Sequence, residues 1–466
     1  MTRVSTIDSG FLLTESPHSP KHVASLMIFE LPRGKGPAWL RRLLARMKQQ
    51  PAGYPFNQRL YSRGGVFFEF RTDPLVDLDY HVRHTVLPRP GSDAQLRELV
   101  ARLHANLLDR DRPLWECHLI EGLQGRRFAL YVKIHHTLSD GTTFRRWIDD
   151  FTATTPRGRS SCAIWARPPE PASEAPGPPS LLQAAADVAH TLEGGAKTTL
   201  GVAGLASRML RRRFLGMDDR IALPLSAPHT PLNVETGAAR TLAFTAFPLA
   251  ELRAIGKARG ATINDVVMTL CDMAASHYLE QHGGPPRGSL VVYMPVDVRT
   301  REDDGEGNLV TLLQVKLAST HADALTWLDE VRESIASARE LFSGASRSAL
   351  QYYSLLVALA GQAEEWLKLG RWLPPVNNLV VSNVPGSRVT RYLAGARAVA
   401  MYPVSTLPPL TALNVTCCSY DGVLYFGLVA GRTAMPDLPL LAGYLEEAYR
   451  QLGQATGVLQ AERKSA

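Results

Sequence analysis

Residues 129–151 read ALYVKIHHTLSDGTTFRRWIDDF, and this stretch decides how the first half of the chain folds. Before the two histidines, every second residue from position 128 to position 134 is apolar, a period of two that predicts a strand. After Gly141 the large apolar residues have the spacing of one helical face, at positions 144, 147, 148 and 151. The histidines therefore stand where a strand ends, and Asp140-Gly141 stands where a helix begins.

The two neighbouring histidines are not expected to serve one site together, because adjacent residues of a strand point to opposite faces. We expect His136 to continue the apolar row and His135 to share the other face with Lys133. The chemistry is predicted for His136, since an imidazole with a pKa near neutrality can take a proton from a hydroxyl. His135 is predicted to support the turn. A zinc site is not expected, because the side chains diverge and no third ligand stands at useful spacing.

Other interpretations of this stretch stay open at the level of single residues. A histidine at a strand end is more often structural than functional. Asp140 can hold the loop by pairing with a cation or a backbone N–H, or it can simply cap the helix. Gly141 permits a close approach of another segment.

The string HHTLSDG at 135–141 resembles the HHxxxDG motif of the acyl-CoA-dependent acyltransferase superfamily, which includes chloramphenicol acetyltransferase, carnitine acyltransferases and peptide-synthetase condensation domains. Three more strings resemble motifs of the bacterial wax ester synthase/diacylglycerol acyltransferase family: DRPLWE at 111–116, ND at 264–265 and SNVPG at 382–386. The resemblance runs from about Ser5 to about Leu452. It implies an α/β fold of two chloramphenicol-acetyltransferase-like domains with mixed sheets and an active site in a channel between them.

The domain organisation is predicted from a change of composition after residue 165. Residues 166–180, ARPPEPASEAPGPPS, have the composition of a semi-rigid linker. We expect an N-terminal acyltransferase domain over 1–165, a proline-rich linker and helical connector over 166–225, and a C-terminal acyltransferase domain over 226–466. Within the connector, residues 200–214 have an apolar helical face and end in arginines. Such a helix can lie on an anionic membrane surface or pack on the protein.

Further site residues are predicted in both halves. Asn264 and Asp265 stand at a helix N-terminus, which favours negative charge, although either residue can instead cap the helix. We expect Asn264 to stabilise the oxyanion and Asp265 to support the site. Arg299 ends the strand predicted over 290–299 and is the expected salt-bridge partner of Asp140, since the superfamily resemblance implies an Asp–Arg pair. The same resemblance places Trp115 as structural support beside the site.

Two more histidines are weaker candidates. His22 begins a predicted strand, and His277 lies on the apolar face of the helix that follows Asn264. Neither has an evident partner in the sequence, so both are expected to be structural.

The composition limits the cellular setting and the partners. The chain has 51 Lys and Arg against 44 Asp and Glu, a net charge of +7, which suits anionic lipid or the phosphates of coenzyme A. No nucleic-acid motif accompanies this charge. Five cysteines without CxxC spacing favour a reducing cytoplasm. With no signal-peptide pattern and no long apolar run, we expect a cytoplasmic protein in peripheral contact with the inner membrane or lipid droplets.

The predicted function is transfer of a long-chain acyl group from acyl-CoA to a fatty alcohol, giving a wax ester, or to diacylglycerol, giving triacylglycerol. Acyl-CoA is a substrate, and no metal or other cofactor is expected. No cysteine lies in the histidine motif, which favours direct transfer over a cysteine relay. The alternatives are a carrier-protein-dependent acyltransferase or condensation enzyme, and a non-catalytic lipid-surface protein. The preferred acceptor, the acyl chain length and the oligomeric state stay open.

Overall fold

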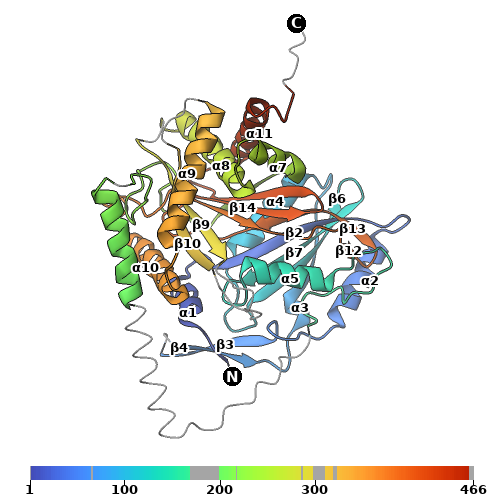
Figure 1. Cartoon of the computed structure of the whole chain (residues 1–466). Coiled ribbons are helices and arrows are strands. Elements are labelled where there is room, and N and C mark those ends of the chain that lie inside the picture. The colour runs from blue at the N-terminus through green and yellow to red at the C-terminus, as the bar shows by residue number, and fades with distance from the viewer. Residues whose placement is uncertain are drawn as a thin grey trace.

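The structure is a computed structural model, and it describes residues 2–64, 67–167, 199–216, 218–284, 287–297, 310–318 and 323–460. Its framework is two six-stranded mixed sheets, covered by helices (Figure 1). Short, hydrogen-bonded strands rich in Val, Ile, Leu and Phe build both sheets, as expected for strands buried on both faces. The predicted α/β class with mixed sheets is therefore confirmed.

The first sheet carries the histidine motif and has the strand order β12-β13-β2-β7-β6-β5. Its strands are β12 (Tyr392–Leu393), β13 (Ala396–Val404), β2 (His22–Glu30), β7 (Arg127–His135), β6 (Trp115–Leu123) and β5 (Val82–Val86). Neighbours are antiparallel except β5, which runs parallel to β6. In the central pair, His22 of β2 lies opposite His135 of β7.

The second sheet has the order β10-β9-β11-β14-β15-β8. Its strands are β10 (Val310–Lys316), β9 (Val291–Asp297), β11 (Leu379–Val384), β14 (Leu413–Tyr420), β15 (Val423–Gly431) and β8 (Arg240–Pro248). Here β11 is parallel to both neighbours, and the other pairs are antiparallel. Asp421-Gly422, an Asp-Gly pair typical of hairpin turns, joins β14 to β15, and both turn residues have positive φ.

Helices cover the sheets, and a small third sheet lies beside the first. The helices are α1 (Thr6–Thr14), α2 (Pro37–Lys48), α3 (Leu78–His81), α4 (Asp93–Ala105), α5 (Gly141–Phe151), α7 (Leu249–Ala258), α8 (Ile263–Gln281), α9 (Ala324–Phe342), α10 (Arg347–Trp366) and α11 (Leu438–Ala455). The small sheet contains β1 (Thr2–Arg3), β4 (Phe67–Thr72) and β3 (Gln58–Arg63). Residues 199–214 are also helical, as predicted for 200–214.

Strands from the second half of the chain complete the first sheet. β12 and β13 follow β11 in sequence, yet β13 pairs with β2 along most of its length. The prediction that the C-terminal domain begins at residue 226 did not include a strand of that domain pairing with the N-terminal sheet. The domain boundaries stay a prediction. Most of the predicted linker, residues 168–198, lies outside the described part of the chain.

The two sheets are joined where β13 crosses β15. The Tyr425 hydroxyl of β15 donates to the Val399 carbonyl of β13 at 2.9 Å. A Cβ at Gly427 would lie 1.7 Å from the carbonyl oxygen of Pro403. Because both groups belong to the backbone, no rotamer change relieves such a contact, and glycine is required by space.

We expect Gly427→Ala to lower the free energy of unfolding by about 1–3 kcal/mol, the usual cost of an overpacked position. Chemical denaturation measures the effect. Gly443→Ala is the matched control, since a Cβ there, on the exposed side of α11, meets nothing within 4 Å. That control should be slightly stabilising. An unchanged midpoint for Gly427→Ala would contradict the described sheet contact.

Candidate active site

The histidine motif forms the predicted strand, loop and helix. β7 ends at His135 and α5 begins at Gly141. Asp140 is the N-cap of α5, and its carboxylate accepts the Thr143 N–H at 2.9 Å. Asp140 is fully buried, so its carboxylate fixes the loop from inside the fold. The capping role is observed, and it is compatible with a further pairing of the same carboxylate.

The two histidine side chains have different surroundings, in line with their predicted divergence. His135 is fully buried, with Nε2 at 3.3 Å from Glu15 Oε1. The Thr137 N–H donates to Nδ1 of His135 at 3.2 Å, so in the neutral ring the hydrogen sits on Nε2, the nitrogen that lies near Glu15. His136 is only partly buried and lines a cavity. Its backbone N–H donates to the Lys21 carbonyl at 2.8 Å.

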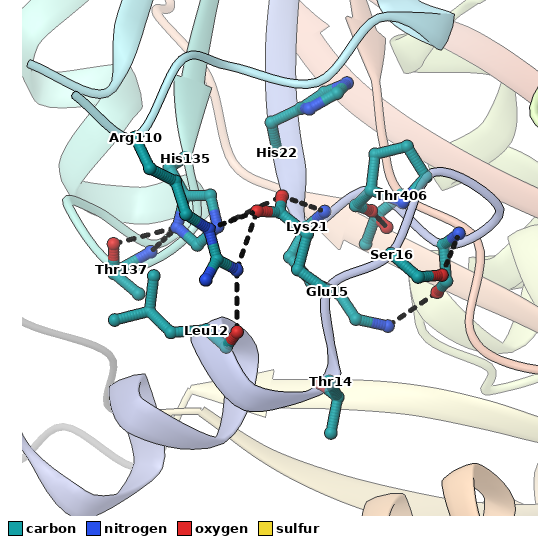
Figure 2. Close-up of polar contacts among 12 residues, drawn as sticks. Leu12, Thr14, Glu15, Ser16, Lys21, His22, Arg110, His135, Thr137 and Thr406 are labelled. Atoms are coloured by element: carbon teal, nitrogen blue, oxygen red, sulfur yellow. Dashed lines mark hydrogen bonds and ion pairs between the residues drawn. The ribbon is translucent and has the colours of Figure 1, made fainter. Parts of the chain in front are cut away.

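Helix α1 holds both histidines in place. Phe11 of α1 stacks on the His136 ring, with centroids 4.6 Å apart and 19° between the planes. Glu15, directly after α1, contacts His135 through Oε1 and accepts from Arg110 Nη2 through Oε2 at 3.0 Å (Figure 2). Arg110 also donates to the Leu12 carbonyl at 2.7 Å. A short helix 120 residues away in sequence thus sets the orientation of the motif.

The Glu15 carboxylate is stabilised in its ionised form. Burial by itself raises the pKa of this carboxyl, but the hydrogen bond and charge of His135, with the Lys21 N–H and Arg110, lower the pKa to about 2. Only 3 % of the side chain is exposed, so water does not screen these contacts. The negative charge favours the Nε2–H form of His135 and keeps its ring fixed.

A largely apolar cavity of ≈ 430 Å³ lies beside His136. Both halves of the chain line it, through α1, the start of α5, the inner face of α10, the end of β11 and the segment 403–411. Apolar walls with a few polar groups are typical of a site for a lipid-like ligand. The resemblance implied an active-site channel between two domains; this cavity is the candidate for it, and its role as the active site stays a prediction.

The SNVPG string closes the cavity against the start of α5. A Cβ at Gly141 would lie 3.0 Å from Val384 Cγ2, so glycine allows the histidine loop to approach β11 closely. Asn383 lines the cavity, and its Nδ2 donates to Asn264 Oδ1 at 2.7 Å. Asn264 itself is not among the cavity-lining residues. Asn264 therefore lies next to the cavity and contacts a residue of its wall, but does not itself line it.

The other predicted site residues lie around this wall. Trp115 is fully buried, donates through Nε1 to the Phe56 carbonyl at 2.7 Å and stacks on His81 and Trp165, so its observed contacts are core packing. Asp265 accepts the Thr262 N–H at 2.7 Å and forms a capping box at the start of α8. Arg299 lies outside the described residues, and its pairing with Asp140 stays a prediction.

His22 and His277 are not part of the cavity wall. His22, the first residue of β2, is buried, and its Nε2 lies 2.6 Å from the carbonyl oxygen of His104 in α4. His277 stacks on Tyr444 of α11, with centroids 4.2 Å apart. These contacts agree with the structural roles expected for both residues.

Sequence reasoning missed Phe11, Glu15, Arg110 and Lys21. No local pattern marks them, because each acts through a contact to a segment far along the chain. Among the described residues, no group of three or more His, Cys, Asp or Glu side chains is placed to hold a metal ion. No helix in the described ranges is long and apolar enough to cross a membrane.

A half-buried histidine on the wall of an apolar cavity, with its neighbour buried and two mixed sheets around it, defines the HHxxxDG class of acyltransferase fold. The family model described as "Wax ester synthase/diacylglycerol acyltransferase catalytic domain" matches residues 4–267, and that described as "WS/DGAT C-terminal domain" matches residues 306–453. The chain belongs to the wax ester synthase/diacylglycerol acyltransferase family, and it is an acyltransferase. The predicted resemblance is confirmed.

Relatives and solved structures agree with this assignment. A probable diacylglycerol O-acyltransferase, tgs2, of Mycobacterium tuberculosis is 36 % identical over 463 residues, covering 97 % of this chain and 98 % of the relative. The structure of a wax ester synthase/diacylglycerol acyltransferase from Marinobacter aquaeolei VT8 matches with a TM-score of 0.74 and 29 % identity, covering 98 % of this chain and 100 % of that one. The first condensation domain of the calcium-dependent antibiotic synthetase matches with a TM-score of 0.60 at 18 % identity, over 98 % of this chain and 96 % of that domain, which shows a shared fold.

Proposed function

We propose that this acyltransferase moves a long-chain acyl group from acyl-CoA to the hydroxyl of a diacylglycerol or a long-chain alcohol, with His136 as the general base. The observation that carries the proposal is the position of His136 on the wall of the apolar cavity while His135 is buried behind it. The names of the relatives, a diacylglycerol O-acyltransferase and a wax ester synthase/diacylglycerol acyltransferase, support the same acceptor classes.

The proposed reaction is a direct transfer. His136 takes the hydroxyl proton as the alcohol oxygen attacks the thioester carbonyl carbon. The tetrahedral intermediate then collapses, the C–S bond breaks, and the same imidazolium returns the proton to the CoA thiolate. Phe11 restrains the ring, and the Glu15–His135 contact fixes the loop that carries it. The products are an ester and free CoA.

The oxyanion of the intermediate needs a preorganised donor. Asn264 is the proposed residue, and its hydrogen bond to the cavity-lining Asn383 makes the two amides a unit. In this arrangement Asn264 acts either on the oxyanion or by orienting Asn383 toward it. Asn383 directly precedes Val384, the β11 residue that packs on Gly141, so its amide lies near the histidine loop, while Asn264 reaches it from the start of α8.

A covalent cysteine intermediate is not part of the proposal. Cys418 lines the cavity, but burial raises the pKa of its thiol to about 12, so the reactive thiolate is disfavoured at neutral pH. The nearby Arg145 charge lowers this pKa and Asp149 raises it, without cancelling the effect of burial.

The test is product analysis with palmitoyl-CoA and either dioleoylglycerol or hexadecanol, read by mass spectrometry. We expect triacylglycerol or wax ester to form, and the Cys418→Ala variant to form the same products. Absence of any acylated acceptor, with a folded protein and both acceptors supplied, would refute the proposed function. Loss of product in Cys418→Ala alone would refute direct transfer.

We also propose that the enzyme works at a lipid surface, through α10 and the helix 199–214. The two helices meet near Gly201, where a Cβ would lie 2.9 Å from Ala349 Cβ (Figure 1). The two helices and the residues just after them expose large apolar side chains at Leu200, Leu210, Phe214, Leu215, Tyr352, Leu356, Trp366, Leu367 and Trp372. Arginines at 208 and 211–213 accompany them, a combination that suits an anionic lipid surface. Because the inner face of α10 lines the cavity, lipid would enter next to this surface.

Replacing Leu356 and Trp366 together with glutamate should weaken binding to anionic phospholipid vesicles by about tenfold or more, since exposed apolar area no longer transfers into lipid. Vesicle flotation measures the change. Leu75→Glu is the matched control, because Leu75 is 86 % exposed but lies between β4 and α3, outside this surface. Equal binding by the double variant and the control would refute the surface.

A further inference from the structure

A buried lysine lies in the cavity wall beside His136. Lys21 is 6 % exposed and lines the cavity, and its carbonyl accepts the His136 N–H. Its Nζ donates to Ser19 Oγ at 2.6 Å, and that hydroxyl donates onward to the Leu407 carbonyl at 3.1 Å. Figure 2 shows the Lys21 side chain running away from the Glu15–His135 contact.

The Lys21 ammonium has N–H donors without a hydrogen-bond acceptor among the described residues. An ammonium carries three N–H groups, and Ser19 is its one hydrogen-bond partner in the described part of the chain. Buried polar groups in native proteins almost always have partners, so a desolvated ammonium that faces a cavity with unused donors indicates a ligand oxygen. Burial lowers the pKa of Lys21 to about 8, although the negative charges of Glu365 and Glu15 raise it. At neutral pH the side chain is therefore mostly charged.

Helix α10 supplies the complementary acceptors. Gln362 and Glu364 line the same cavity and are 1 % and 3 % exposed. The Oε1 atom of each has no hydrogen-bond partner among the residues described. Gln362 Nε2 donates to Glu365 Oε2 at 2.8 Å, and Glu365 is the carboxylate that acts most strongly on Lys21. The α10 groups and Lys21 therefore belong to one polar region of the wall.

We propose that Lys21, with Gln362 and Glu364, forms a subsite that binds the ester and hydroxyl oxygens of an acylglycerol acceptor. Lys21 donates to an ester carbonyl oxygen, and the α10 oxygens accept from a hydroxyl. A long-chain alcohol has a single oxygen, which must lie at His136 to react, and so leaves the subsite unfilled. The subsite selects acylglycerol over alcohol, and this inference rests on the proposed function.

The experiment measures binding without acyl-CoA, so it does not depend on turnover. Thermal-shift titration with dioctanoylglycerol and with 1-dodecanol gives an affinity for each ligand in the wild type, in Lys21→Met and in Gln362→Met. Lys48→Met, on α2 away from the cavity, is the matched control. We expect Lys21→Met to weaken dioctanoylglycerol binding by roughly tenfold or more, as for loss of a charged hydrogen bond, with dodecanol affinity changed less than about twofold.

The stability of Lys21→Met gives an independent readout. Because the replacement removes a buried ammonium with one partner, its melting temperature should equal or exceed that of the wild type. Equal weakening for both ligands, or no weakening for either, would overturn the subsite. If Lys21→Met does not fold, the proposal is tested with Gln362→Met, by comparing its affinities for dioctanoylglycerol and 1-dodecanol in the same way. Selective binding without product formation would instead count against the proposed reaction alone.

Discussion

His136→Ala is expected to lower kcat for acyl transfer by about 10²–10⁴-fold, the usual contribution of a general base. In the proposed mechanism this imidazole takes the hydroxyl proton, and no other histidine lines the cavity in the described residues. Acyl-CoA and acceptor should still bind, since the cavity walls are unchanged. Steady-state kinetics with a saturating acceptor measures the loss.

The fold should survive this substitution. The ring makes an aromatic contact with Phe11 that is worth about 0.5–1.5 kcal/mol, a small part of the stability of a chain this size. His277→Ala is the matched control, because His277 stacks on Tyr444 in nearly the same geometry but does not line the cavity. If His277→Ala lost as much activity as His136→Ala, or if His136→Ala stayed active, the assigned role of His136 would be wrong.

Glu15→Gln is expected to lower the free energy of unfolding at neutral pH by about 3 kcal/mol. The pKa of Glu15 is about 2 in the folded chain against an ordinary value of 4.5, and each unit is worth about 1.36 kcal/mol. A carboxyl with a depressed pKa stabilises the fold above its unfolded pKa. That stabilisation is lost as pH falls from about 4.5 to about 2. The replacement amide also places an NH₂ group against donors from either Arg110 or His135.

Unfolding titrations between pH 2 and pH 7 measure this effect. The wild type should lose stability across the acid range, and the difference between wild type and Glu15→Gln should shrink toward pH 2. Asp79→Asn is the control, because Asp79 pairs with Lys48 at an exposed position where such pairs contribute little. A pH-independent difference would show that Glu15 does not act through its charge.

The local parts of the fold and site were predictable from the sequence. Alternation ending at His135 and helical spacing after Gly141 placed the motif on β7 and α5, because both signals come from consecutive residues. The Asp421-Gly422 turn was predictable for the same reason. The different surroundings of His135 and His136 were predictable from the alternation of side chains along a strand. Which of the two is buried was not predictable, because β7 is buried on both faces and ends at His135.

Long-range pairings were not predictable. β13 adds to β2 across some 370 residues of sequence, and nothing in its composition names that partner. Glu15 and Lys21 reach the site because α1 and the start of β2 lie against the histidine loop. The position of Asn264 at the N-terminal end of α8 was predictable from the sequence. Its contact with Asn383 was not, because that contact depends on how β11 and α8 pack together. Tertiary contacts of this kind leave no periodic signal.

The most direct test of the account is the release of free CoA thiol from palmitoyl-CoA by the purified protein, with and without dioleoylglycerol or hexadecanol. We expect thiol release that requires an acceptor, exceeds one equivalent per protein, and disappears in His136→Ala while remaining in His277→Ala. Release that is independent of acceptor, or that persists in His136→Ala, would contradict transfer to a hydroxyl activated by His136.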